Sequence, residues 1–257
     1  MRKMSVAGQF YPKECSEIKR YIEVFSQELT HDKQRYRAIV SPHAGYVYSG
    51  FTANKAYARV DFSQIKRVII LGPSHRVYLK GASVALTDRY ESPCATMKID
   101  EKYSLELKAK YDFLHFQDSA HSEHSTETQV PFIEHYASEV SLVEIVYGEL
   151  SYKSLVPLLK EILNDKDSFL VISTDLSHFH SLDEANSLDN ICLKAVKEMN
   201  VSDLEKGCEA CGITGVKALL EASTDLGLKS EVIDYRTSAD ASGDTSRVVG
   251  YMSALVR

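Results

Sequence analysis

Hydrophobic runs alternate with helical patterns along most of the chain. Runs rich in Val, Ile and Leu predict strands at residues 37–41, 67–71, 82–86, 140–146, 169–173, 230–235 and 247–256. The stretches 68–71 and 170–172 are continuously apolar, which is typical of strands buried on both faces of a parallel sheet. The alternation of apolar and polar residues at 230–235 instead indicates a half-buried or edge strand.

Helical patterns fill the intervals between these strands. In the segment 14–29, Ile18, Tyr21, Ile22 and Phe25 form one apolar stripe at spacings of three and four. Similar patterns predict helices at 150–164, 184–199 and 213–222. Strands that alternate with helices predict an α/β fold of three layers, in which helices cover a mostly parallel or mixed sheet on both sides.

The domain organisation follows from length and regularity. A chain of 257 residues is near the upper limit for one hydrophobic core, and no repeat or Pro/Gly-rich linker divides it. We therefore expect a single domain over residues 1–257. The least regular stretch is 88–126, where we expect loop and short helix, and long loops in compact domains are often functional.

Charge and hydropathy exclude some classes of partner. The net charge is -6, from 36 acidic and 30 basic residues, and the basic residues are scattered. This balance argues against nucleic acid as a partner. No apolar run approaches the length of a membrane helix, and residues 1–8 lack the apolar stretch of a secretory signal.

The cysteine pattern favours a reducing compartment. The five cysteines form an odd and sparse set: Cys15, Cys94, Cys192, Cys208 and Cys211. This set predicts no disulfide framework and a cytoplasmic location. Cys192 lies on an apolar stripe and is expected to be a plain core residue. The pair at 208 and 211 resembles half of a redox or zinc motif, but no second pair exists for a four-cysteine zinc site.

Histidines follow the ends of three predicted strands. His43 comes after strand 37–41, His75 after 67–71 and His178 after 169–173. Ligands of open α/β sheets bind outside the carboxyl ends of the strands. If the strands are parallel neighbours, the three imidazoles converge on one cleft.

A transition-metal site needs such imidazoles and often an anionic ligand. The candidates for the anion are Asp175 and a cysteine. Cys211 directly precedes the helical run 213–222, and a helix N-terminus lowers the pKa of a thiol. Asp175 has an equal alternative role as the N-cap of the segment after its strand. His180 is interpreted as a surface residue or a neighbour of the ligands.

A fourth polar cluster spans residues 121–129, before the apolar run 130–133. One interpretation is helix capping with a solvated polar surface, in which Ser125 begins a helix. The other is a loop over the cleft, with His124 beside a ligand or the bound substrate. We favour the first interpretation for His121 and leave both open for His124.

Several motifs of hydrolases and nucleotide-binding proteins are missing from the sequence. It contains no G-x-S-x-G elbow, no phosphate-binding loop of the G-x-x-x-x-G-K-[ST] type, no G-x-G-x-x-G turn and no H-E-x-x-H.

Taken together, the segments around the candidate residues resemble the Memo family, the B component of AmmeMemoRadiSam gene neighbourhoods. The matching segments are 7–12, 42–50, 71–75, 123–125, 129–132, 173–178, 211–212 and 250–251, in the family's order. The resemblance implies a fold similar to that of class III extradiol (LigB-like) dioxygenases, which are non-haem iron enzymes. It implies iron or copper as the metal, with zinc as a further option.

The resemblance also implies roles for individual residues. His43, His75 and Cys211 match the family's metal ligands, and Asp175 and His178 match residues that line the same cleft. The dioxygenases have a carboxylate as the third ligand, whereas this chain has Cys211. A thiolate is softer, favours copper or zinc and is itself oxidisable, which argues against ordinary catechol cleavage.

Three hypotheses follow for the function. The leading one is a metal-dependent redox protein, in which His178 is a general acid or base and Asp175 orients it or a bound water. The second is a non-catalytic module that binds a peptide or a small anion in the same cleft. The third, a metal-independent hydrolase using His178 and Asp175, lacks an activated nucleophile other than Cys211. Neither the substrate nor the oligomeric state follows from the sequence.

Overall fold

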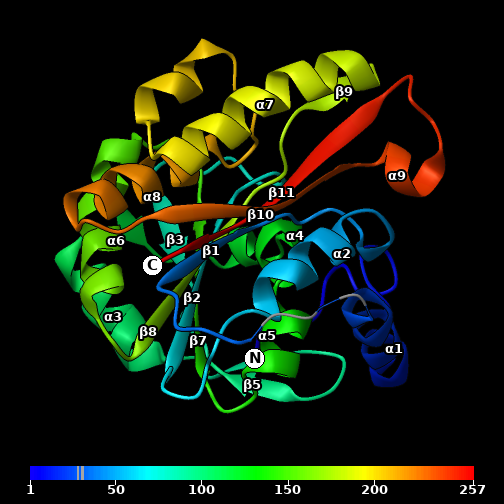
Figure 1. The fold of residues 1–257 in the computed structure, drawn as a ribbon. Helices are drawn as coiled ribbons and strands as arrows, with labels where there is room; N and C mark the ends of the chain where they lie inside the picture. Colours follow the sequence, from blue (N-terminus) through cyan, green and yellow to red (C-terminus); the bar gives the residue numbers. More distant parts are fainter. Residues whose placement is uncertain (28, 30–31) are drawn as a thin grey trace.

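The fold is built on one mixed β-sheet (Figure 1). The computed structural model describes residues 1–27, 29 and 32–257. In this part of the chain the strands follow the order β10-β11-β1-β8-β2-β7-β3-β6, and β9 pairs with β11. The strands of this sheet are β1 Ala38–Ser41, β2 Arg67–Pro73, β3 Ala82–Val84, β6 Leu114–His115, β7 Ser141–Tyr147, β8 Ser168–Ser173, β9 His178–His180, β10 Ser230–Thr237 and β11 Val248–Val256.

The centre of the sheet is parallel and its flanks are antiparallel. Strands β1, β8, β2 and β7 run parallel to one another. Strand β11 pairs antiparallel with β1 and with β10, and β3 pairs antiparallel with β7. The seven predicted strands are confirmed, and the alternating segment 230–235 lies in the edge strand β10, as expected.

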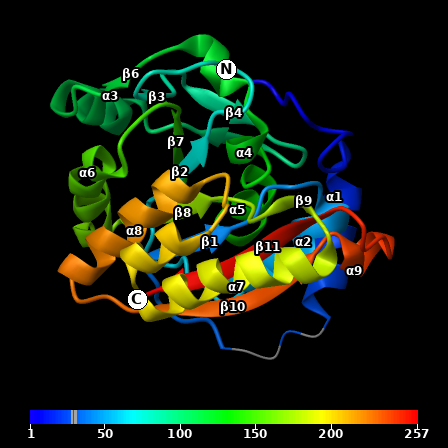
Figure 2. The ribbon, with the colours of Figure 1, turned by 90° about the horizontal axis from the view of Figure 1, so that it is seen from above.

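Helices cover both faces of the sheet and give the predicted three layers (Figures 1 and 2). One face carries α3 Glu101–Lys110, α6 Tyr152–Asn164, α7 Leu182–Glu198 and α8 Ile213–Asp225; the other carries α1 Cys15–Ser26, α2 Tyr46–Tyr57 and α5 Val130–Tyr136. Successive side chains of a strand point to opposite faces. In β1, Ala38 and Val40 therefore join the core under α6–α8, whereas Ile39 joins the core under α1 and α2.

The helices predicted from apolar stripes are confirmed within a few residues of their bounds. Residue 28 of the predicted segment 14–29 lies outside the described residues. The apolar pattern of the sequence does not predict α2, because the buried face of this helix includes the polar residues Ser49, Thr52 and Asn54. The remaining short helical elements are η1 Asp118–His121, α4 His124–Glu127, η2 Val201–Lys206 and α9 Ala239–Ser242.

The expectation of loop and short helix at 88–126 is wrong for much of that stretch. It contains the hairpin strands β4 Arg89–Glu91 and β5 Thr96–Lys98, as well as α3 and β6. Three-residue strands are too short for a periodic signal. Helix α3 buries only Ser104 and Leu107, so it shows no apolar stripe.

The prediction that the cysteines form no disulfides is also wrong. Cys15 is bonded to Cys94, and Cys192 is bonded to Cys208. The Cα atoms of these pairs lie 4.6 and 5.0 Å apart although 79 and 16 positions separate them in sequence, and the spacing of cysteines along a chain does not reveal such proximity. Cys192 is buried in the core as expected, but it is not a free thiol. Cys211 is the cysteine left free.

The length and the apolar character of the helices bear on whether one of them could cross a membrane. In the described ranges, none combines the length and the apolar character needed to cross a bilayer.

Candidate metal centre

Three adjacent parallel strands bring the predicted site residues to one edge of the sheet. Strand β8 lies between β1 and β2. His43 follows the end of β1, His75 follows β2 and Asp175 follows β8. The convergence predicted for His43 and His75 therefore arises from the parallel register, whereas the third imidazole of the cluster is His124 and not the predicted His178.

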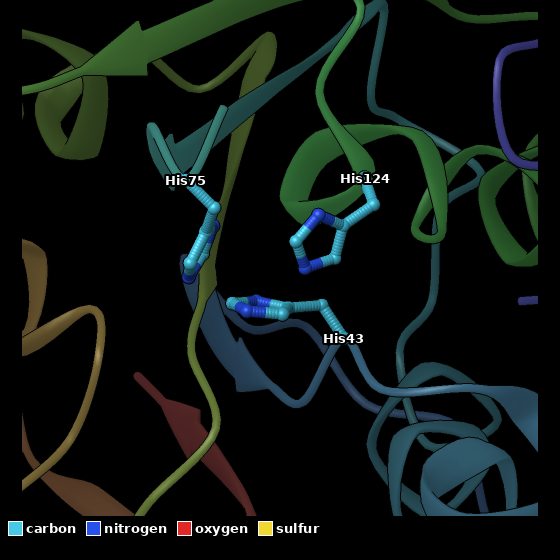
Figure 3. A group of neighbouring side chains, drawn as sticks. All are labelled: His43, His75 and His124. Carbon is cyan, nitrogen blue, oxygen red and sulfur yellow. The ribbon is translucent and has the colours of Figure 1, made fainter. Parts of the chain in front are cut away.

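His43, His75 and His124 form the centre of the site (Figure 3). One ligand atom from each imidazole lies within 4.8 Å of those of the other two. The ring centroids are 5.2 Å apart for His43 and His75, 5.4 Å for His43 and His124, and 4.6 Å for His75 and His124. His43 is buried, His124 is partly buried and His75 is exposed, so the cluster faces solvent on the side of His75.

His124 is the member of this cluster whose role the sequence left open. It is the first residue of the short helix α4, one position before the predicted start at Ser125. The polar run 121–129 therefore both caps helix α4 and contributes His124 to the site. The sequence shows a glutamate directly before this histidine, but helix capping explains the same residues, and the burial of Glu123 is visible only in the fold.

Glu123 holds two of the three imidazoles. Its Oε2 accepts a hydrogen bond of 2.7 Å from the backbone N–H of His75, and its Oε1 accepts one of 2.8 Å from that of His124. Oε1 also lies 2.8 Å from Nδ1 of His124 and 3.5 Å from Nδ1 of His75. Burial alone would raise the pKa of Glu123, but the two imidazoles and the His75 N–H outweigh it and hold that pKa below its ordinary value. Carboxylates in this position orient metal-binding histidines.

His43 is fixed by the neighbouring strand. Its Nδ1 lies 2.9 Å from Oγ of Ser173, and its backbone N–H donates to Oδ1 of Asp175 over 2.7 Å. Burial, followed by the nearby His75 and His124, lowers the pKa of His43 well below its ordinary value. The imidazole is therefore neutral at physiological pH, which is the form that binds metal ions.

Cys211 lies beside this cluster. Its Sγ is 3.4 Å from Nε2 of His43 and accepts a hydrogen bond from the backbone N–H of Asp175 over 3.2 Å. Burial, together with the charge of Asp175, raises the pKa of this thiol to about 12. The expectation that the start of α8 lowers that pKa is wrong, because desolvation outweighs the helix terminus.

Asp175 also lies beside His43. Oδ2 of Asp175 is 4.0 Å from Nε2 of His43, and burial raises the pKa of this carboxyl group. Asp175 binds the His43 loop, so its alternative role as a helix cap is not the one observed. His178 is partly exposed in β9, and its charge acts on the pKa of both His43 and Asp175. His180 pairs with Glu209 at the surface, as expected.

A hollow lies next to the cluster. It has a volume of about 630 Å³ and is lined by residues that include Phe10, Tyr11, Tyr46 and Val47. The ring of Phe10 is 4.6 Å from the ring of His124. Phe10 therefore contacts both this hollow and the imidazole cluster.

His121 is not part of the cluster. It is 4% exposed, with Nε2 2.8 Å from Oγ of Ser83 and Nδ1 2.9 Å from Oε2 of Glu144. The interpretation of His121 as solvated polar surface is wrong, because both of its ring nitrogens are engaged inside the protein.

Comparison with known proteins places the chain in a family. The family model described as Memo-like protein matches residues 2–255. A MEMO1 family protein of Aquifex aeolicus is 34% identical over 266 aligned residues, which cover 99% of this chain and 98% of the relative. MEMO1 family proteins of Nitrosopumilus maritimus and Methanobrevibacter smithii are 31% and 30% identical, and the alignments cover 98% and 100% of both chains, respectively. The three-layer architecture is consistent with the expected relation to LigB-like dioxygenases, and the chain belongs to the Memo family.

Proposed function

We propose that this protein binds one iron or copper ion through His43 and His75, with His124 and Cys211 as the adjoining ligands, and that it serves in redox chemistry. The observation that carries the proposal is the set of three imidazoles with ligand atoms within 4.8 Å of one another. Imidazole is a common ligand of both metals. A bound ion of this kind supplies one-electron chemistry and coordination positions for a small ligand.

The outer contacts support a metal site over a purely structural cluster. Protein oxygens lie beside Nδ1 of each of the three rings, from Ser173 for His43 and from Glu123 for the other two. This leaves Nε2 as the nitrogen directed away from the holding group. Metal-binding histidines generally have their second nitrogen held by such a partner.

The chain's own residues set the surroundings of this site. Glu123 orients two rings, and Asp175 fixes the loop of His43. His178 is partly exposed and its charge acts on the pKa of Asp175, and we propose that it accepts or releases a proton there. Its role as general acid or base is part of the proposal.

The third ligand distinguishes two versions of this site. With His124, the ligand set is three imidazoles, which suits iron, copper and zinc alike. With Cys211, the set contains a thiolate, which shifts the preference towards copper or zinc. The distance of 3.4 Å between Cys211 and His43 supports a site that both residues adjoin.

Parallel metal reconstitution tests the proposal. Protein without a histidine tag is loaded anaerobically with Fe(II), Cu(I) or Zn(II), the affinity of each is measured, and oxygen uptake is followed with small phenols and thiols. We expect one ion of iron or copper per chain with sub-micromolar affinity, on the order of −8 kcal/mol or better. Wild-type protein that binds none of the three ions would contradict the proposal.

The same preparation tests the binding-module hypothesis. Binding of a peptide or a small anion to the cleft, with an affinity that a chelator leaves unchanged, would favour a non-catalytic role. Loss of that binding on chelation would instead place the ion within the binding site.

A further inference from the structure

Helix α4 has only four residues, too few to be stable on its own, yet it carries His124. Its place is set by its side chains. Oγ of Ser125 donates to the backbone oxygen of Pro73 at the end of β2, over 2.7 Å. Oγ1 of Thr126 donates to Glu144 on β7. The helix is therefore fixed to the sheet from one side, and its remaining side chain is Glu127.

Glu127 ties the N-terminal segment to this helix. The side chain is fully buried and lies at the centre of five donors. It accepts from the backbone N–H groups of Ser5 and Val6 at 2.8 Å, from Oγ of Ser5 at 2.6 Å and from Oη of Tyr11 at 2.8 Å. The fifth donor is Arg2. One carboxylate thus holds both ends of the segment 2–11.

Arg2 connects Glu123, which caps α4, with Glu127, the last residue of that helix. Its Nη1 donates to Oε2 of Glu127 over 2.7 Å, and its Nη2 donates to the backbone oxygen of Glu123 over 3.3 Å. The guanidinium group is buried and lies over the ring of Tyr90. The Arg2–Glu127 pair therefore reaches the residue that orients His75 and His124.

The same segment contacts the imidazoles directly. The ring of Phe10 packs on that of His124 at 4.6 Å. The backbone oxygen of Phe10 accepts from the N–H of Tyr46 over 2.7 Å, three residues after His43. Residues 2–11 thus connect the loop of His43 with the helix of His124, although they lie far from both in sequence.

We infer that Glu127, with Arg2 and Phe10, positions the metal-binding imidazoles by holding the N-terminal segment 2–11 against α4. Glu127 acts through Glu123 and His124 and contacts no ligand atom itself. The inference rests on the proposed metal site. It adds that the N-terminal segment holds the imidazoles of that site in position. Outer partners of this kind change metal affinity about 10–100-fold when they are removed.

The test compares two buried carboxylates with the same substitution. Glu127→Gln keeps the shape of the side chain and removes its charge. Glu134→Gln is the matched control, because Glu134 is also buried but accepts from Ser92 and Cys94, which form no hydrogen bond with the imidazole cluster in the described residues. Fe(II) and Cu(I) affinities and thermal stability are measured for both variants and the wild type. We expect Glu127→Gln to lose about 10–100-fold in affinity, and Glu134→Gln to keep wild-type affinity.

A purely structural role gives a different result. If Glu127→Gln lowers thermal stability but the folded variant binds both ions as tightly as the wild type, the inference is wrong. Phe10→Leu provides a milder second variant, for which we expect a several-fold loss of affinity with little loss of stability. If the wild type itself binds no ion, the proposed function fails. Hydrogen exchange of residues 123–128 in metal-free protein then tests the anchoring alone, and unchanged exchange in Glu127→Gln would overturn it.

Discussion

His121 and His124 are three residues apart, and each lies beside a buried glutamate, yet their surroundings differ. His121 has Glu144 on one ring nitrogen and Ser83 on the other. His124 has Oε1 of Glu123 2.8 Å from its Nδ1, but in the described part of the chain neither of its ring nitrogens makes a hydrogen bond. His124 faces two further imidazoles, whereas His121 stacks on Phe116 at 6.0 Å.

The comparison separates a structural histidine from one that is available to a ligand. A buried histidine with both nitrogens engaged stabilises the protein by satisfying its neighbours. A histidine whose Nδ1 lies beside a carboxylate and whose Nε2 is free can be oriented for coordination by that carboxylate. Both histidines have a neighbouring carboxylate, so the two regions differ in the number of hydrogen-bonded ring nitrogens: two for His121 and, among the described residues, none for His124.

The largest expected effect follows from removing two histidines of the cluster. In the double variant His43→Ala/His75→Ala, we expect metal affinity to fall by more than about 100-fold, because two direct ligands are lost and even outer partners contribute 10–100-fold. Metal content after dialysis against a weak chelator measures this. A double variant that retains as much iron or copper as the wild type would exclude these ligands.

Removal of the structural histidine should give the opposite pattern. In His121→Ala, Glu144 loses a partner inside the core, and we expect the free energy of unfolding to fall by about 2–3 kcal/mol. Metal affinity should fall far less than in the double variant, because His121 reaches α4 only indirectly, through Glu144 and Thr126. Urea denaturation and metal titration of the same sample check both. A tenfold loss of affinity without a loss of stability would erase the distinction between the two regions.

The role of Cys211 can be tested by comparing the affinities for two metal ions. In Cys211→Ser, we expect Cu(I) affinity to fall by about tenfold and Fe(II) affinity to change less, because the thiolate is the soft ligand. Competition titrations with each ion measure the ratio. Equal and small changes for both ions would show that the three imidazoles form the ligand set without the sulfur.

The acid sensitivity of His43 gives the smallest effect. Its pKa is lowered in the folded protein, whereas the unfolded chain has an ordinary value of about 6.5, so the unfolded state binds the proton first as the pH falls. Stability contributed by the neutral ring is thus present above pH ~6.5 and is lost below it, by up to about 1.4 kcal/mol per pH unit. In metal-free protein, His43→Gln should show a shallower decline between pH 7.5 and 5.5. If stability declines equally in the wild type and in His43→Gln, the acid sensitivity does not come from His43.

The sheet and most helices could be predicted because their residues carry local signals. The continuous apolar run at 68–71 indicates a central strand on its own. Helix α2 could not be predicted, because Ser49, Thr52 and Asn54 are buried by tertiary contacts that sequence periodicity does not report. The disulfides of Cys15 and Cys192 depend in the same way on distant partners.

The site was partly predictable for a related reason. His43 and His75 follow parallel strands, and the rule for strand ends places both at one edge. His124 lies on a four-residue helix that only its contacts position, so no rule of spacing selects it over His121. The prediction of a lowered thiol pKa at Cys211 was wrong, because the burial that raises this pKa is not visible in the local sequence.

The most direct test of the account is the coordination of a bound ion. X-ray absorption spectroscopy of wild-type protein reconstituted with one equivalent of Fe(II) or Cu(I) reports the ligand atoms around the metal. The account predicts two or three imidazole nitrogens at about 2.0–2.1 Å, a distance typical of first-row metals, with a sulfur contribution from Cys211 for copper. A bound ion surrounded only by oxygen atoms, with no imidazole scattering, would contradict it.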